Sequence, residues 1–192
     1  MARKSTANSK EDVKENINIP ETPEVETVEV ETPLNLEQQV TVKSIAGWAT
    51  GFARILTIGD VEIPKRGSIR LSRNEIITQA HMGNRLISGN DSRGSHATLI
   101  IEDKATIREL GFENAVQFSD KRVKDLFDIQ DQYEFEEKLK EEIQTRAEKY
   151  ALMVSIYKQG LNDFSKIRFC ENYTGYNMDN VKKDDDNKDV KR

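Results

Sequence analysis

The chain has 192 residues with 29 basic and 34 acidic side chains, so its net charge is −5. A mean hydropathy of −0.71 is low for a globular protein and indicates that part of the chain stays outside any folded core. No run approaches the roughly 18–20 apolar residues of a membrane-spanning helix. The polar start MARKSTANSKED lacks the apolar core of a signal peptide, and a single cysteine, Cys170, excludes an internal disulfide. We therefore expect an intracellular protein without a membrane span.

Residues 1–38 are predicted to form a flexible acidic arm. This segment holds three of the four prolines, has no glycine and no aromatic residue, and repeats the letters EVET. Such a composition cannot bury enough apolar surface to offset the entropy of the chain. The arm is a solvated linker or, alternatively, a docking strand in which Val25, Val28 and Val30 lie along the sheet edge of a partner protein.

Residues 39–103 are predicted to form a β-rich domain. Strands are expected at 52–58, 61–63, 68–71 and 97–101, separated by turns at Gly59-Asp60 and at 64–67. Ser72 and Glu75 have the spacing of a capping box and predict an inserted helix that ends near 83, with a short strand at 85–87. The pattern predicts a small antiparallel sheet, barrel-like in outline.

Residues 104–178 are predicted to form a helical domain of short helices. Ser119 and the pairs Asp131-Glu134 and Thr145-Glu148 have the pattern of helix N-termini, and Asp103 and Asn162 are further capping candidates. Glycines at 111, 160 and 175 predict helix ends. Residues 179–192 are expected to be a flexible charged tail. The predicted fold class is α+β, a small sheet followed by a helical bundle with tails at both ends.

The sequence offers no constellation that predicts catalysis. Two histidines and one cysteine leave few ligands for zinc, and the common nucleotide-binding glycine motifs are absent. Ser95 and His96 are adjacent, and neighbouring residues of a strand point to opposite faces, so they do not form a nucleophile–base pair. We expect no catalytic, cofactor-binding or metal-binding residues, no cofactor and no enzyme activity.

Two sets of residues are candidates for binding. Trp48 joins the three valines of the arm as a candidate protein contact, and the loops at 64–67 and 89–94 accompany it. The alternative is a nucleic-acid site, because cations with nearby aromatic side chains on a small sheet contact phosphates and stack on bases. The cations of that alternative belong to the basic middle segment: Lys65, Arg66, Arg70, Arg73, Arg85 and Arg93.

Three runs, KSIAGWATGFARI, GDVEIPKRGSIRLSRNEI and GNRLISGNDSRGSHATLIIED, precede a helical stretch that ends ALMVSIYKQGLNDFSKIRFCENYTGY. Over about residues 40–176 this pattern resembles uncharacterised proteins of tailed bacteriophages from low-GC hosts. The resemblance implies a component of the virion or of its assembly, located in the host cytoplasm or in the particle, and it assigns no catalytic residue. We therefore expect a structural or interaction protein whose partners are other protein subunits, with nucleic-acid binding as the alternative.

Overall fold

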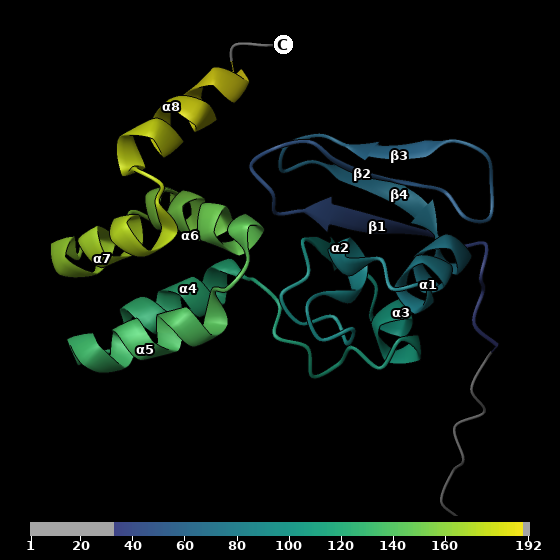
Figure 1. Ribbon diagram of the computed structural model, residues 1–192, viewed down its shortest axis with the longest axis horizontal. Coiled ribbons are helices and arrows are strands. Elements are labelled where there is room, and N and C mark those ends of the chain that lie inside the picture. Colours follow the sequence, from purple (N-terminus) through teal and green to yellow (C-terminus); the bar gives the residue numbers. More distant parts are fainter. Residues whose placement is uncertain (1–32, 190–192) are drawn as a thin grey trace, which may run out of the picture. The chain divides into compact units, whose positions relative to one another are not determined.

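A three-stranded antiparallel sheet organises the first half of the fold (Figure 1). The computed structural model describes residues 33–189, with side chains as far as residue 183. The central strand β1 (Gln39–Ser44) pairs with β4 (Ser68–Ser72) on one edge and with β5 (Leu99–Ile101) on the other. Val42 lies opposite both Ile69 and Ile101. Alternate residues of β1 are buried, as expected for a strand with one face on a core.

A separate two-stranded hairpin contains β2 (Thr50–Ala53) and β3 (Asp60–Ile63), with Phe52 opposite Val61. The α+β class is confirmed, but the sheet is not a closed barrel, because these two strands form a sheet of their own. The strand expected over 52–58 ends at Ala53. The next backbone amides bond to a side chain of the following helix instead of continuing the strand ladder.

Helix α1 (Arg73–His81) follows β4 directly, and the Ser72 side chain accepts the amide of Glu75 as the sequence predicts. The capping box is incomplete, because the Glu75 carboxylate does not accept the backbone amide of Ser72. It accepts amides of the β2–β3 loop instead. The expected strand at 85–87 is wrong: the segment is the single helical turn α2 (Arg85–Ser88). Asn84 starts this turn by accepting the amide of Leu86.

The next five helices each begin at a side chain that caps the first turn. Ser119, Asp131 and Thr145 accept amides as predicted, and Thr145 and Glu148 complete a capping box. Asp163, one residue after the predicted Asn162, caps the helix that follows it. The helices after α2 are α3 (Lys104–Glu109), α4 (Asp120–Phe127), α5 (Gln132–Glu142), α6 (Arg146–Gln159), α7 (Phe164–Thr174) and α8 (Met178–Asp189).

Helix α6 lies at the centre of the helical half and contacts α4, α7 and α8. Its residues from Ala147 to Ile156, with the exception of Lys149, are buried. A small apolar cluster of Ile45, Ala46, Ala147 and Ala151 joins the end of β1 to the first turns of α6. The described residues from Leu34 onward form one compact unit.

The C-terminal segment differs from the expected charged tail, because it begins as helix α8. Val181 in this helix is only 2% exposed and belongs to the same hydrophobic cluster as Leu152 and Cys170. Met178, the first residue of α8, packs against the same cluster. These two side chains attach the otherwise polar helix to the helical core. Two apolar residues among charged neighbours are too weak a pattern to predict that contact.

Candidate interaction surface

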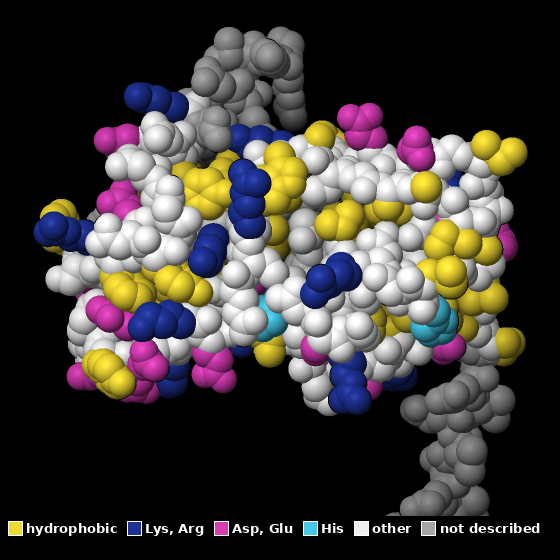
Figure 2. All heavy atoms as spheres, in the orientation of Figure 1, with side chains coloured by type: hydrophobic (Ala, Val, Ile, Leu, Met, Phe, Trp, Pro, Cys, Tyr) yellow, Lys and Arg dark blue, Asp and Glu magenta, His cyan; other side chains and the backbone are white. Residues whose placement is uncertain are grey.

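Residues 54–59, which we call the aliphatic loop, join β2 to β3 and carry three exposed aliphatic side chains. Ile55 is 44% exposed, Leu56 46% and Ile58 105%. The other exposed large hydrophobic residues of the described chain are separated in sequence, at Leu36, Met82, Tyr133 and Phe164. Single exposed apolar side chains are common, whereas contiguous ones mark contact surfaces. Figure 2 shows hydrophobic side chains gathered at the end of the sheet region where α1 packs.

The backbone of the aliphatic loop is closed at its base. The amide of Arg54 donates to the carbonyl of Gly59 at 2.9 Å, one step beyond the last pair of the β2–β3 ladder. Gly59 has φ +119°, a conformation that side chains disfavour. The hairpin therefore turns at a defined residue, and the aliphatic side chains lie between two fixed ends.

Side chains of helix α1 also hold the backbone of the aliphatic loop. The Glu75 carboxylate accepts the amides of Ile55 at 2.9 Å and Leu56 at 3.1 Å. Gln79 Nε2 donates to the carbonyl of Ala53 and to Glu75, and its own oxygen accepts from Asn84. Glu75 and Gln79 are buried. This polar clamp fixes the loop backbone while the loop side chains remain in solvent.

The charge of Glu75 strengthens the clamp. Burial alone raises the pKa of this carboxyl, but the hydrogen bonds from Gln79, Ile55 and Leu56 and the nearby charge of Arg54 outweigh it, so its pKa lies below the ordinary 4.5. The group is thus a carboxylate at neutral pH. Amide hydrogen bonds to a carboxylate are stronger than those to a neutral acceptor.

Acidic side chains adjoin the exposed aliphatic ones. Asp60 and Glu62 of β3 are exposed, whereas Arg54, the cation within the aliphatic loop, is half-buried. An apolar tip with carboxylates beside it is complementary to an apolar hollow with a basic rim on another protein. The same carboxylates oppose contact with an anionic lipid surface.

The sequence did not single out this loop. The sequence pattern predicts Ile55, Leu56 and Ile58 within the strand at 52–58, because periodicity does not distinguish an exposed apolar side chain from a buried one. One feature of the sequence does indicate exposure, namely that the three residues lie just before the turn at Gly59. Hairpin loops are solvent-exposed in most folds, so an apolar run there indicates contact with a partner.

The predicted protein-contact residues have two outcomes. Val25, Val28 and Val30 lie outside the described residues. Trp48 is half-buried beside the helical core, and the guanidinium of Arg146 lies 4.5 Å from its ring centroid. The indole therefore already has a cation on one face and apolar neighbours beside it.

Arg73, one of the six cations of the nucleic-acid alternative, is only 3% exposed. Its guanidinium donates to Asp103 and Thr106, both at 3.0 Å, and to the carbonyl of Asn35 at 2.6 Å. These bonds tie the segment before β1 to α1 and to the start of α3. Arg73 is therefore occupied within the fold and does not face a phosphate backbone.

The other five cations lie on separate elements. Lys65 and Arg66 belong to the turn before β4, and Lys65 Nζ lies 5.3 Å from the ring centroid of Tyr150. Arg70 lies on β4 and donates to the carbonyl of Gln39. Arg85 and Arg93 are exposed on α2 and on the following loop. Arg66 lines a cavity together with lysines from β1 and α6, and the other five cations do not line that cavity.

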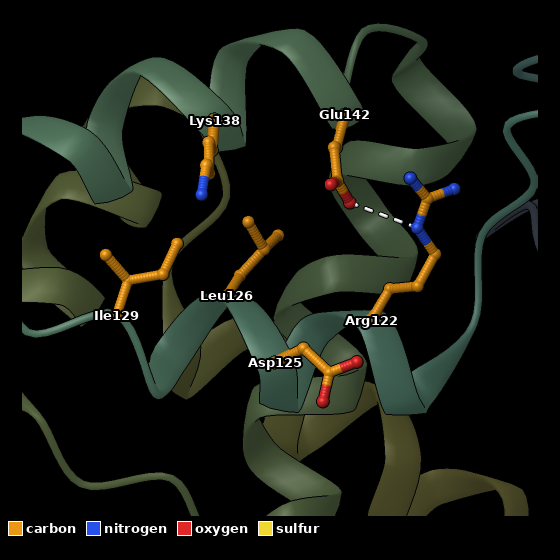
Figure 3. A pocket seen from close by; sticks show the side chains of 6 residues that line it. All are labelled: Arg122, Asp125, Leu126, Ile129, Lys138 and Glu142. Atoms are coloured by element: carbon orange, nitrogen blue, oxygen red, sulfur yellow. Dashed lines mark ion pairs between the residues drawn. The ribbon is translucent and has the colours of Figure 1, made fainter.

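A small cavity of about 180 Å³ lies between α4 and α5 (Figure 3). Arg122 Nε pairs with Glu142 Oε2 at 3.1 Å across one side of it, and Lys138 pairs with Glu134 at 2.7 Å. The arginine and the lysine that line this cavity are thus both paired inside the chain.

No protein-family model, curated protein or solved structure matches the chain. In the part of the chain that the structure describes, no three His, Cys, Asp or Glu side chains are grouped so that they could hold a metal ion. Among the described helices, none is both long and apolar enough to cross a membrane.

Proposed function

We propose that this protein is a non-catalytic interaction subunit that docks onto another protein through the aliphatic loop. The observation that carries the proposal is Ile58, a fully exposed isoleucine on a loop whose backbone is clamped by Glu75. A clamped loop loses little conformational entropy on binding. Ile58 contributes roughly 1.5–3 kcal/mol when fully buried in a partner. Ile55 and Leu56 contribute less, because each is already more than half buried in the free protein.

The partner in this proposal is a protein subunit with an apolar hollow and basic residues at its rim. The carboxylates of Asp60 and Glu62 support that choice, because they adjoin the apolar tip. The resemblance to tailed-phage proteins supports a multi-subunit assembly, in which the chain would be a component of the particle or of its assembly. Nucleic-acid binding by the exposed cations is the alternative, and the test must distinguish it from protein docking through the aliphatic loop.

The test is capture of partners by the tagged full chain from its native lysate. The loop variant carries Ile55→Ser, Leu56→Ser and Ile58→Ser together, and the matched control carries Tyr133→Ser, which removes another exposed hydrophobic side chain from α5. Equal thermal midpoints for the three proteins establish that folding is unchanged. We expect wild type and control to retain the same protein, with or without nuclease, and the loop variant to lose it.

Two results would overturn the proposal. Retention of that protein by the triple variant would show that the contact lies elsewhere. Loss of capture after nuclease treatment would show that nucleic acid bridges the proteins. A steep fall of capture with salt that Arg85→Ala and Arg93→Ala make shallower would then assign the exposed cations as the contact.

A further inference from the structure

A cavity of about 370 Å³, larger than the one between α4 and α5, opens where the sheet meets the helices. One wall comes from the end of β1 and from β5, and the other from α6 and from the residues just before α4. Ile100, Phe118 and Val154 give it apolar surface. Its volume lies within the range of pockets that hold small molecules, and such pockets are common where two parts of a fold meet.

Three cations from three elements line this cavity: Lys43 from β1, Arg66 from the turn before β4, and Lys158 from α6. The cavity has one lining carboxylate, Asp120, and its Oδ1 accepts the hydroxyl of Ser155 at 2.7 Å. Among the described residues, neither Lys43 nor Lys158 has an ion-pair partner. The lining charge is therefore positive and favours an anion.

The backbone of Arg66 gives independent support. Its φ is +50°, a conformation that costs a side-chain-bearing residue free energy and that glycine adopts readily. The turn is fixed at this place, because the amide of Arg66 donates to Ala46 at 3.0 Å and the carbonyl of Gly67 accepts from Ser44 at 2.8 Å. An arginine held in an unfavourable backbone conformation at the edge of a cavity indicates a role for its side chain.

We propose that this cavity binds a small organic anion with an apolar body and a single carboxylate or phosphate head. The body packs against Ile100, Phe118 and Val154, and the head lies among Lys43, Arg66 and Lys158. The two lysine ammonium groups and the guanidinium all donate charge-assisted hydrogen bonds to either kind of head. This site is independent of the aliphatic loop, so its test does not depend on the proposed function.

The test uses four probes below their micellar concentrations: octanoate, octyl phosphate, 1-octanol and inorganic phosphate. Binding to the full chain is measured by titration calorimetry and by the rise in thermal midpoint, since a ligand that binds only the folded state stabilises it. We expect one of the two octyl anions to bind saturably. The alcohol lacks the charge and inorganic phosphate lacks the apolar body, so each should bind about tenfold more weakly or worse.

Matched substitutions locate the site. Arg66→Gly removes the guanidinium, and glycine adopts the same backbone conformation readily, so the turn should be kept while the anion binds about ten- to hundredfold more weakly. Ser92→Gly is its control, because Ser92 has φ +60° and does not line the cavity. Lys158→Gln should weaken binding as well, whereas Lys121→Gln, on α4 and outside the cavity, should leave it unchanged.

The comparison of octanoate with octyl phosphate tells which head the site takes. Binding of 1-octanol as tight as that of the anions would overturn the proposal, because the cations would then have no role. Unchanged anion binding in Arg66→Gly would place the ligand elsewhere, and absence of saturable binding by both octyl anions would contradict the proposal outright.

Discussion

The carboxylate of Glu75 accepts the backbone amide of Ile55 at 2.9 Å, which joins α1 to a loop twenty residues earlier in the chain. The second carboxylate oxygen accepts the amide of Leu56. Two amides that follow the end of β2 thus find their acceptor on a buried helix residue. This bond is why a loop with three exposed aliphatic side chains keeps a defined backbone.

Replacement of Glu75 should release the loop. In Glu75→Gln one carboxylate oxygen becomes an NH₂ group, which faces a backbone amide and leaves it unsatisfied. We expect a loss of about 1–3 kcal/mol in the free energy of unfolding and faster hydrogen exchange at the amides of Ile55 and Leu56. Urea denaturation and exchange mass spectrometry measure the two effects. Glu137→Gln, on the exposed face of α5, should change stability by no more than about 0.5 kcal/mol.

Acid should destabilise the protein through Glu75 and Asp103. Burial raises the pKa of the Asp103 carboxyl, but bonds from Thr106 and Arg73 outweigh it, so its pKa lies below the ordinary 3.8, as that of Glu75 lies below 4.5. Both groups therefore bind protons more readily in the unfolded chain. Their stabilising contribution is complete above the ordinary values and is lost as the pH falls through the lowered ones.

The measurement is the urea midpoint between about pH 6 and pH 3. Asp103→Asn should be less stable than wild type at about pH 6 and should lose less stability than wild type as the pH falls to about 3. Parallel pH profiles for the two proteins would contradict this assignment.

Helix α6 and the loop after α2 are joined by His96 and Glu148, whose Nδ1 and Oε1 atoms lie 2.9 Å apart in a buried position. His96→Ala should cost about 1–3 kcal/mol, because it leaves a buried acceptor short of one donor. His96→Asn should recover much of that loss, since asparagine offers an N–H donor near the place of Nδ1 and tolerates the positive φ of 57° at this residue. Equal thermal midpoints for the two variants would mean that the hydrogen bond contributes nothing.

Cys170 should be unreactive in the folded protein. It is fully buried, and burial raises the pKa of its thiol to about 12. Because the thiolate is the nucleophile, a thiol reagent should modify Cys170 only at the rate at which the helical core opens. Ser165→Cys, exposed on the same helix, should react at once. Comparable rates for the two cysteines in the native protein would contradict the buried position of Cys170.

Local patterns predicted the local features of this fold. The side chains of Ser72, Ser119, Asp131 and Thr145 begin helices where the sequence places them, because a cap depends on residues three positions apart. The strand at 60–63 and the helix end at Gly160 follow in the same way from turn and glycine signals.

Long-range contacts account for what the sequence could not predict. The acceptor of the Ile55 amide lies twenty residues away in the chain. Local pattern does not reveal that bond and therefore predicts that the strand continues to Ile58. The sequence predicts Arg73 as a surface cation. The structure buries it, because its guanidinium donates hydrogen bonds to Asp103 and Asn35, thirty and thirty-eight residues away in the chain. The cavity beside Arg66 draws its cations from three elements whose meeting no spacing in the chain reveals.

The most direct test of the proposed function is site-specific photo-cross-linking from the aliphatic loop. A benzophenone side chain replaces Ile58 in the tagged full chain and, as control, Phe164, which is 75% exposed on α7. We predict that position 58 gives a covalent adduct with one protein of the native lysate, unchanged by nuclease, and that position 164 does not. The same adducts from both positions, or none from position 58, would contradict docking through this loop.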